Sequence, residues 1–342
     1  MEDTIIRTKG LTKRYGTITA VDHLDLSVAR GEVFGLLGPN GAGKTTTTLM
    51  LLGLTEPTSG SAHIDCCDCT REPAKVKSLV GYLPDSIGFY PNLTGRENLC
   101  FTGALNGLDR DECLRRADQL LNRVGMAYAA DRKAGGYSRG MNQRLGIADV
   151  LMKDPAVIIL DEPTLGIDPE GIRELIALIR ELSVQDGRTV LISSHQLYQV
   201  QQICDRVGIF VKGRLIACGP ISQLGHQLES EGLYLLDVQT DPPDGLLEAL
   251  HALEGIRSVS LGADGVLHVE SSRDIRSQLT ALAAENGCPL LALRQRGGDL
   301  EEIYRKYFEK AGDVHDTPEN PTAGAGKKFF PGAWFRRHAP SR

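Results

Sequence analysis

The chain lacks three features that would indicate a membrane-spanning, secreted or nucleic-acid-binding protein. No apolar run approaches the roughly 18 residues that a spanning helix needs, and Met1 to Thr4 lack the basic-then-apolar layout of a signal peptide. An excess of basic residues is also missing, because the formal net charge is −6. We therefore expect a protein that neither crosses a membrane nor is exported, and that carries no nucleic-acid footprint over its whole surface.

Cysteine is present, but not in a pattern that predicts disulfides or a metal site. The 8 cysteines are scattered over 342 residues, which is typical of reduced cytosolic thiols. The one cluster, Cys66-Cys67-Asp68-Cys69, lacks the spacing usual for zinc ligands, and no second pair or histidine accompanies it. We interpret the cluster as an exposed turn; soft ligands for a thiophilic metal are the alternative.

What the chain does contain is centred on one glycine-rich stretch, Gly38-Pro39-Asn40-Gly41-Ala42-Gly43-Lys44-Thr45. It follows the apolar run 33–37 and leads into a helix-forming segment that begins at Thr46. Strand, glycine-rich turn and helix occur in the order that a phosphate-binding loop requires, with backbone N–H groups and the helix N-terminus facing the phosphates. We expect Lys44 to reach the β- and γ-phosphates and Thr45 to offer its hydroxyl to magnesium. The alternative is a glycine-rich turn that fits the pattern by chance.

Two further apolar runs end in polar side chains. Residues 157–160 lead into Asp161 and Glu162, and residues 189–192 lead into Ser193-Ser194-His195. A strand that is apolar on both faces belongs inside a parallel sheet, and ligands bind at the carboxyl ends of such strands. We therefore expect Asp161, Glu162 and His195 to lie beside the phosphate loop. By itself, His195 would be read as an ordinary surface or core histidine.

The remaining pattern indicates a helical insert and a second unit. From about residue 86 to residue 155 the apolar spacing is helical, and Thr94 with Glu97 has capping-box spacing. Past residue 225 the order strand, helix, strand, strand, helix, strand and a final helix suggests a small ferredoxin-like α+β unit. The apolar stripe of the final helix, between Leu300 and Phe308, predicts core packing, and a ligand box is the alternative.

Seven motifs occur in an order that resembles the ATPase subunits of ABC transporters. They resemble the aromatic loop (Tyr15), Walker A (38–45), the Q-loop (81–85), the signature (137–141), Walker B (160–164), the D-loop (166–169) and the switch histidine (194–195). The resemblance covers about residues 4 to 224. The spellings Gly-Tyr-Leu-Pro-acid and Tyr-Ser-basic-Gly-Met look like the branch that energises multidrug, antibiotic, lipid or polysaccharide exporters with separate permeases.

The resemblance implies a fold, an activity and partners. The fold would be an α/β P-loop NTPase, with a RecA-like core, an antiparallel β subdomain and the helical insert, over residues 1–224. Residues 225–312 would form the accessory domain and residues 313–342 a flexible basic-aromatic tail. The implied activity is ATP hydrolysis with Mg2+. The implied partners are a second ATPase subunit, identical or related, and a transmembrane permease, at the cytoplasmic face of the cell membrane.

The resemblance also implies the roles of individual residues. Glu162 would orient or deprotonate the attacking water, Asp161 would hold magnesium through its water shell, and His195 would grip the γ-phosphate. The residues expected to contact the nucleotide are Tyr15, Gly38, Pro39, Asn40, Gly41, Ala42, Gly43, Lys44, Thr45, Thr46 and Asp168, together with Ser138 and Gly140 of the opposite subunit.

Two positions depart from the broad family. Asp85 stands where the Q-loop usually has glutamine, and Arg139 replaces a small residue of the signature. Aspartate can still offer an oxygen to magnesium, so Asp85 is included among the expected metal ligands. Arg139 would either add positive charge beside the phosphate or point to solvent.

Two alternatives concern function and the C-terminus. A soluble ABC protein acting on ribosomes or nucleic acid is the second reading, but such relatives carry two ATPase units or long coiled coils. This chain has one phosphate loop and no long heptad run, so transport is favoured and no nucleic-acid partner is expected. The accessory domain would serve regulation or subunit pairing, or merely stabilise the chain. The basic-aromatic residues 327–337 would contact a membrane surface or permease, or remain a solvated end.

Overall fold

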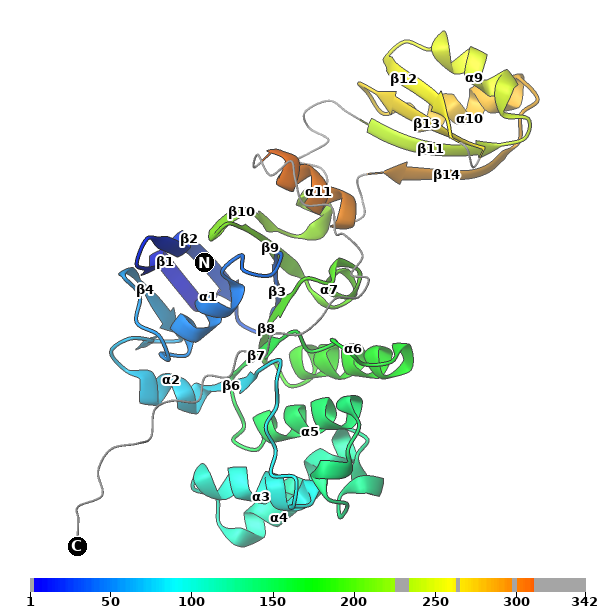
Figure 1. Ribbon diagram of the computed structural model, residues 1–342. Coiled ribbons are helices and arrows are strands. Elements are labelled where there is room, and N and C mark those ends of the chain that lie inside the picture. The colour runs from blue at the N-terminus through cyan, green and yellow to red at the C-terminus, as the bar shows by residue number, and fades with distance from the viewer. Residues whose placement is uncertain (1–2, 225–233, 263–264, 297–299, 311–342) are drawn as a thin grey trace, which may run out of the picture.

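The computed structural model describes residues 3–224, 234–262, 265–296 and 300–310, and this part of the chain contains three β-sheets (Figure 1). The first sheet is antiparallel, in the order β2-β1-β4-β5. Its strands are β1 (Thr4–Tyr15), β2 (Ile18–Ala29), β4 (Ser59–Ile64) and β5 (Cys67–Asp68). The predicted antiparallel subdomain is therefore present.

The second sheet has six strands, in the order β10-β9-β3-β8-β7-β6. These are β3 (Val33–Leu37), β6 (Val80–Leu83), β7 (Val157–Asp161), β8 (Thr189–Ser194), β9 (Arg206–Val211) and β10 (Arg214–Gly219). All neighbours are parallel except β9 and β10. Strands β3, β7 and β8 are buried along their whole length, as their apolar sequences predict. Their carboxyl ends therefore meet at one edge of the sheet.

Alternate side chains of this sheet enter two different cores. Ile158 and Leu160 of β7 pack with the helical side of the molecule, whereas Val157 and Ile159 pack with the antiparallel sheet. The helices beside the sheet are α1 (Lys44–Leu51), α2 (Pro73–Leu79), α6 (Pro169–Val184) and α7 (Leu197–Ile203). Among the helices in the described ranges, none combines the length and the apolar composition required to span a bilayer.

The helical insert lies between β6 and β7, as predicted. It contains α3 (Gly95–Leu105), α4 (Arg110–Arg123), α5 (Arg139–Leu151) and the 3-10 helices η1 (Ala127–Ala129) and η2 (Ala134–Gly136). The predicted capping box is confirmed: Glu97 N–H donates to Thr94 Oγ1 at 3.1 Å, and Thr94 N–H donates to Glu97 Oε2 at 2.8 Å. The side chain of Arg96 joins α3 to α4 through Asp118 and to the following loop through Asp131.

The cysteine cluster differs from the predicted exposed turn. Only Cys66 is exposed, whereas Cys67 and Cys69 are buried, and Cys67 begins a strand that pairs with β4. Burial raises the pKa of the Cys69 thiol to about 12, so this thiol stays protonated. In the part of the chain that the structure describes, no three His, Cys, Asp or Glu side chains gather as metal ligands. Two of its three cysteines, Cys67 and Cys69, are therefore part of a hydrophobic core.

The C-terminal unit has the predicted ferredoxin-like topology. Its elements are β11 (Tyr234–Thr240), α9 (Pro243–His251), β12 (Ile256–Leu261), β13 (Val266–Ser271), α10 (Arg276–Glu285) and β14 (Leu290–Arg296). The antiparallel sheet order is β12-β13-β11-β14. Leu236, Leu267 and Leu279 are among the fully buried residues of its own hydrophobic core.

The last described helix, α11 (Leu300–Lys310), packs on α7 of the first unit (Figure 1). Leu300 and Ile303 are fully buried in the same cluster as Val200 and Ile203 of α7. The backbone N–H of Leu300 donates to Gln201 Oε1 at 3.3 Å. The apolar stripe of α11 is thus core packing, as expected, but the core belongs to the six-stranded sheet.

We expect Ile303→Ala to lower the free energy of unfolding of the first unit by about 2–5 kcal/mol, because it removes a fully buried side chain. Hydrogen exchange would quicken in α7, while exchange in the ferredoxin-like unit would stay the same. The matched control is Leu291→Ala, an exposed residue of β14, with an effect within about 0.5 kcal/mol. Unchanged exchange in α7 would contradict the shared core.

Candidate nucleotide-binding site

The glycine-rich loop connects β3 to α1, as predicted, and two of its glycines leave no room for a side chain. Gly43 has φ +108°, and a Cβ there would lie 2.3 Å from Ala20 O. A Cβ on Gly38 would lie 2.5 Å from Phe210 O. Because α1 begins at Lys44, its unpaired N–H groups lie at the end of this loop. The geometry is that of a phosphate-binding loop.

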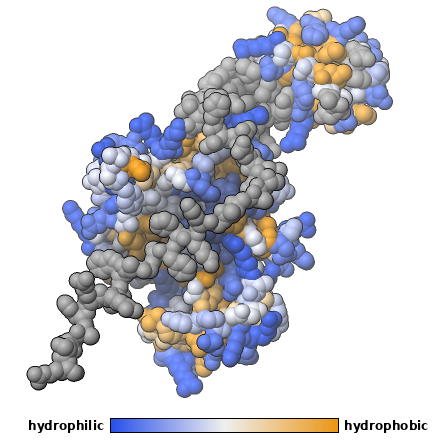
Figure 2. Space-filling model, in the orientation of Figure 1, coloured by the Kyte–Doolittle hydropathy of each residue, from blue (hydrophilic) through white to orange (hydrophobic). Residues whose placement is uncertain are grey.

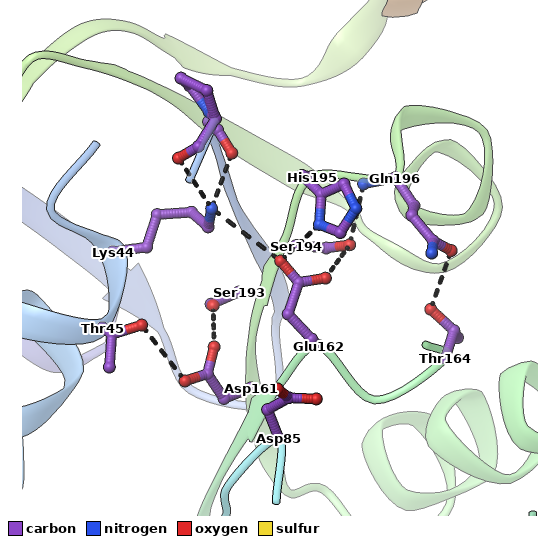
Figure 3. Close-up of polar contacts among 12 residues, drawn as sticks. Lys44, Thr45, Asp85, Asp161, Glu162, Thr164, Ser193, Ser194, His195 and Gln196 are labelled. Atoms are coloured by element: carbon purple, nitrogen blue, oxygen red, sulfur yellow. Dashed lines mark hydrogen bonds and ion pairs between the residues drawn. The ribbon is translucent and has the colours of Figure 1, made fainter. Parts of the chain in front are cut away.

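The ammonium group of Lys44 lies buried inside the loop. Its Nζ donates to Gly38 O at 2.7 Å and to Pro39 O at 3.2 Å, and lies 3.9 Å from Glu162 Oε1 (Figure 3). The side chain is only 6% exposed. Burial lowers the pKa of Lys44, and the nearby carboxylates of Glu162 and Asp161 act in the opposite direction. A phosphate entering the loop would replace carbonyl partners with charged oxygens.

Asp161 ends β7 and faces Thr45. Its Oδ2 accepts from Thr45 Oγ1 at 3.3 Å, and its Oδ1 accepts from Ser193 Oγ (Figure 3). The sheet register explains the second bond, because Asp161 pairs with Ser193 of the neighbouring parallel strand. Ser193 was not predicted as a site residue. Its position at the end of a buried strand beside β7 was the available signal.

Glu162 turns out of the strand into the site. Its φ of +47° is in the left-handed region, which is rare for a residue with a side chain and is found at functional sites. The backbone N–H donates to Ser193 O at 2.9 Å. Oε1 lies 2.8 Å from His195 Nδ1, and Oε2 accepts from Ser194 Oγ at 3.3 Å (Figure 3). The predicted meeting of Glu162 and His195 is therefore observed, with Ser194 as a second partner that was not predicted.

Other predicted nucleotide contacts lie outside this group. Tyr15 ends β1, is half exposed, and has Lys13 Nζ 5.0 Å from its ring centroid. Ser138 caps the N-terminus of α5, with Gly140 in its first turn, and Asp168 caps α6. In the described residues, none of these four hydrogen-bonds to the Lys44, Asp161, Glu162 and His195 side chains. Their roles stay predictions, as do those of Asn40, Gly41 and Ala42 in the loop and of Thr46 in α1.

The two residues that depart from the family pattern contact each other. Arg139 Nη2 lies 3.3 Å from Asp85 Oδ1 in an ion pair between half-exposed side chains. Arg139 therefore does not point freely to solvent, and Asp85 has a cation as its partner. This pair could not be anticipated from the sequence, because the two residues are 54 positions apart, Arg139 at the start of α5 and Asp85 in the loop after β6.

The assembled site fits phosphoryl transfer from a nucleotide. A buried ammonium and a helix N-terminus can bind a polyphosphate, and a carboxylate held by an imidazole can orient a water. Phosphoryl transfer needs positioning and charge stabilisation more than covalent catalysis, and this group supplies both. The chemistry is that of a nucleoside triphosphatase.

Comparison with known proteins identifies the family. Residues 21–165 match the family described as ABC transporter. The bacitracin transport ATP-binding protein BcrA of Bacillus licheniformis is 36% identical over 89% of this chain and 97% of its own length. The daunorubicin resistance ATP-binding protein DrrA3 of Streptomyces coeruleorubidus is 41% identical over 89% and 92%, respectively. A solved ATP-binding subunit of an ABC transporter has 30% identity and a TM-score of 0.61, covering 67% of this chain and 95% of its own. With this similarity and the hydrolytic geometry, we conclude that the chain belongs to the ABC transporter family, as an ATP-binding subunit that hydrolyses ATP.

Proposed function

We propose that this chain drives the export of an antibiotic or related drug through a separate membrane permease, as one of two ATPase subunits that pair around ATP. The proposal rests mainly on one observation: the signature residues are not part of the group formed by the other motif residues. Lys44, Glu162 and His195 gather at one edge of the sheet, whereas Ser138 and Gly140 lie at the start of α5 and, among the described residues, form no hydrogen bond with them. A second subunit would supply the missing signature residues. Relatives named for bacitracin transport and daunorubicin resistance support the substrate class.

The Thr45 and Asp161 oxygens form a donor set that suits Mg2+. A hydroxyl and a carboxylate lie 3.3 Å apart, and no cluster of three acidic, histidine or cysteine ligands occurs within the described ranges. With only two protein oxygens, the other coordination positions of the ion would be open to phosphate oxygens and to the water molecules that Mg2+ usually keeps. Thr45 and Asp161 would hold the ion, which would supply charge neutralisation on the phosphates. Asp85 remains a prediction as a further oxygen donor.

Four side chains of this chain would have separate roles in hydrolysis. Lys44 would exchange the Gly38 and Pro39 carbonyls for phosphate oxygens and keep the charge of the triphosphate in the loop. Glu162 would accept a proton from the attacking water, and His195 would hold the Glu162 carboxylate while contacting the γ-phosphate. Ser193 would keep the Asp161 carboxylate turned toward Thr45.

We propose the helical insert as the surface that meets the permease. Tyr90, Phe101 and Leu105 are exposed large hydrophobic residues of this insert, and the rings of Tyr90 and Phe101 pack edge to face with centroids 4.9 Å apart. Figure 2 shows hydrophobic residues on the surface of the lower lobe, where the insert lies. Apolar residues within a polar rim are typical of protein interfaces. Docking there would place the chain at the cytoplasmic face of the membrane.

The domain division is also a proposal. Residues 1–224 would form the ATPase domain and residues 225–312 the accessory domain, with α11 as the part of the latter that packs on α7. The proposed tail, residues 313–342, lies outside the described residues, and so do the basic-aromatic positions 327–337. Its contact with a membrane surface or permease stays a prediction.

The test of the proposal is recovery of the chain with a tagged permease from the same genomic neighbourhood. We expect Phe101→Asp to reduce this recovery by about tenfold, because it replaces an exposed aromatic ring that packs against Tyr90 with a charge. ATP hydrolysis by the isolated variant would be unchanged. The matched control is Val184→Asp, an exposed apolar residue of α6 outside the insert, with normal recovery. Recovery of the wild-type protein with ribosomes in place of the permease would contradict the proposal.

A further inference from the structure

One side chain of the signature turn contacts two other loops. Arg139 is the first residue of α5 and stands between Ser138 and Gly140. Its guanidinium forms the ion pair with Asp85, which lies just after β6 in the Q-loop. The contact therefore joins the signature turn (residues 137–141), where α5 begins, to the loop that follows β6.

The second contact is with the D-loop. A Cβ added to Gly166 would lie 2.7 Å from Arg139 Cδ and 2.8 Å from Arg139 Nε, so the Arg139 side chain lies directly against the backbone of Gly166. Gly166 also has φ +74°, a conformation that disfavours other residues. Another residue at position 166 would have to adopt this φ and would displace the end of the Arg139 side chain. The Arg139 side chain is thus packed on the D-loop while its guanidinium holds the Q-loop.

The α5 helix gains nothing electrostatically from this arginine. A cation at a helix N-terminus opposes the helix dipole, and the first turn of α5 contains no acidic residue to compensate. The compensating carboxylate, Asp85, comes from another element. Both side chains are 51% exposed, so the pair is weak enough to break and reform as the loops move.

We propose that Arg139 is a positioning residue that makes the signature turn, the Q-loop and the D-loop move together, and so links the two ATP sites of the paired subunits. This inference rests on the proposed function. There, Asp85 lies near the ATP held by its own phosphate loop, whereas Ser138 and Gly140 act on the ATP held by the partner. Through Arg139, a loop movement that follows ATP hydrolysis at one site then reaches the signature residues that act on the other ATP.

The experiment measures ATP hydrolysis by the full-length protein as a function of ATP concentration. We expect Arg139→Ala to bring the Hill coefficient from above 1 in the wild type to about 1, and to lower kcat by about three- to fivefold, the range expected for an exposed ion pair. Binding of ATP to the unpaired subunit would be unchanged. Arg139→Lys, which keeps the charge, would retain most of the cooperativity.

Two comparisons separate positioning from a loss of stability. The double variant Arg139→Ala with Asp85→Ala would be no worse than Asp85→Ala alone, because the two residues act as one unit. Arg180→Ala is the matched control, since Arg180 Nη1 pairs with Asp205 Oδ1 at 2.7 Å at the opposite edge of the sheet. It would leave the Hill coefficient and kcat unchanged.

The inference is overturned if Arg139→Ala keeps the wild-type Hill coefficient, or if the effects of Arg139→Ala and Asp85→Ala simply add. ATP-dependent pairing of the Glu162→Gln variant, measured in the same preparations, tests the proposed function separately. If the Glu162→Gln variant pairs but Arg139→Ala keeps the wild-type Hill coefficient, only the proposed link between the two ATP sites is rejected. An absence of pairing rejects the paired arrangement itself.

Discussion

Glu162→Gln is expected to lower the rate of ATP hydrolysis by a factor of about 10²–10⁴ while leaving ATP bound. The carboxylate is the group placed to accept a proton from water, and it is held 2.8 Å from His195 Nδ1 and 3.3 Å from Ser194 Oγ. Glutamine keeps the size and one acceptor oxygen, but its amide cannot take a proton from water. The rate of phosphate release at saturating ATP measures the effect.

The same variant is expected to accumulate as an ATP-bound pair of subunits. If hydrolysis removes the shared γ-phosphate and thereby separates the subunits, blocking hydrolysis preserves the pair. Light scattering with ATP and Mg2+ would show a doubled mass, and ADP would not substitute for ATP. A Glu162→Gln protein that binds ATP but stays single would contradict the role proposed for the second subunit.

Lys44→Ala is expected to weaken ATP binding by about 100-fold, because it removes a buried cation from the centre of a loop shaped for phosphates. In the structure its ammonium donates to the Gly38 and Pro39 carbonyls and lies 3.9 Å from Glu162 Oε1. Its loss therefore also leaves a carboxylate without its neighbouring cation. Equilibrium titration with ATP measures the change in Kd.

Lys153→Ala provides the control for removing a partly buried lysine. Lys153 Nζ donates to Lys77 O at 2.7 Å, and burial lowers the pKa of Lys153 as it does that of Lys44. The substitution would alter stability without changing Kd for ATP. If both variants lost ATP binding equally, the effect would reflect misfolding, and the assignment of Lys44 to the phosphates would lose its support.

The sequence could predict the site wherever a short motif also determines the local backbone. The glycine-rich loop requires its strand and helix, and the ends of buried parallel strands must meet at one edge, so Asp161, Glu162 and His195 were expected together. The ferredoxin-like topology followed from the order of its elements. In each case local pattern and tertiary arrangement agree.

The features that escaped prediction depend on contacts between distant segments. The Arg139–Asp85 pair joins the start of α5 to the loop after β6, and only the folded chain defines their relative position. The stripe on α11 predicted a buried face, but the partner, α7, lies about a hundred positions earlier. Cys67 and Cys69 were expected in an exposed turn, because the spacing of cysteines does not show which core they enter.

The attachment of α11 places the end of the C-terminal unit on the helix that follows the site histidine. β14 ends at Arg296 and α11 begins at Leu300, while α7 begins two residues after His195. If α7 tilts on release of phosphate, we expect α11 to move with it, because the two helices share one core. A fluorophore on α11, paired with one on the helical insert, would then read out turnover as a change in energy transfer.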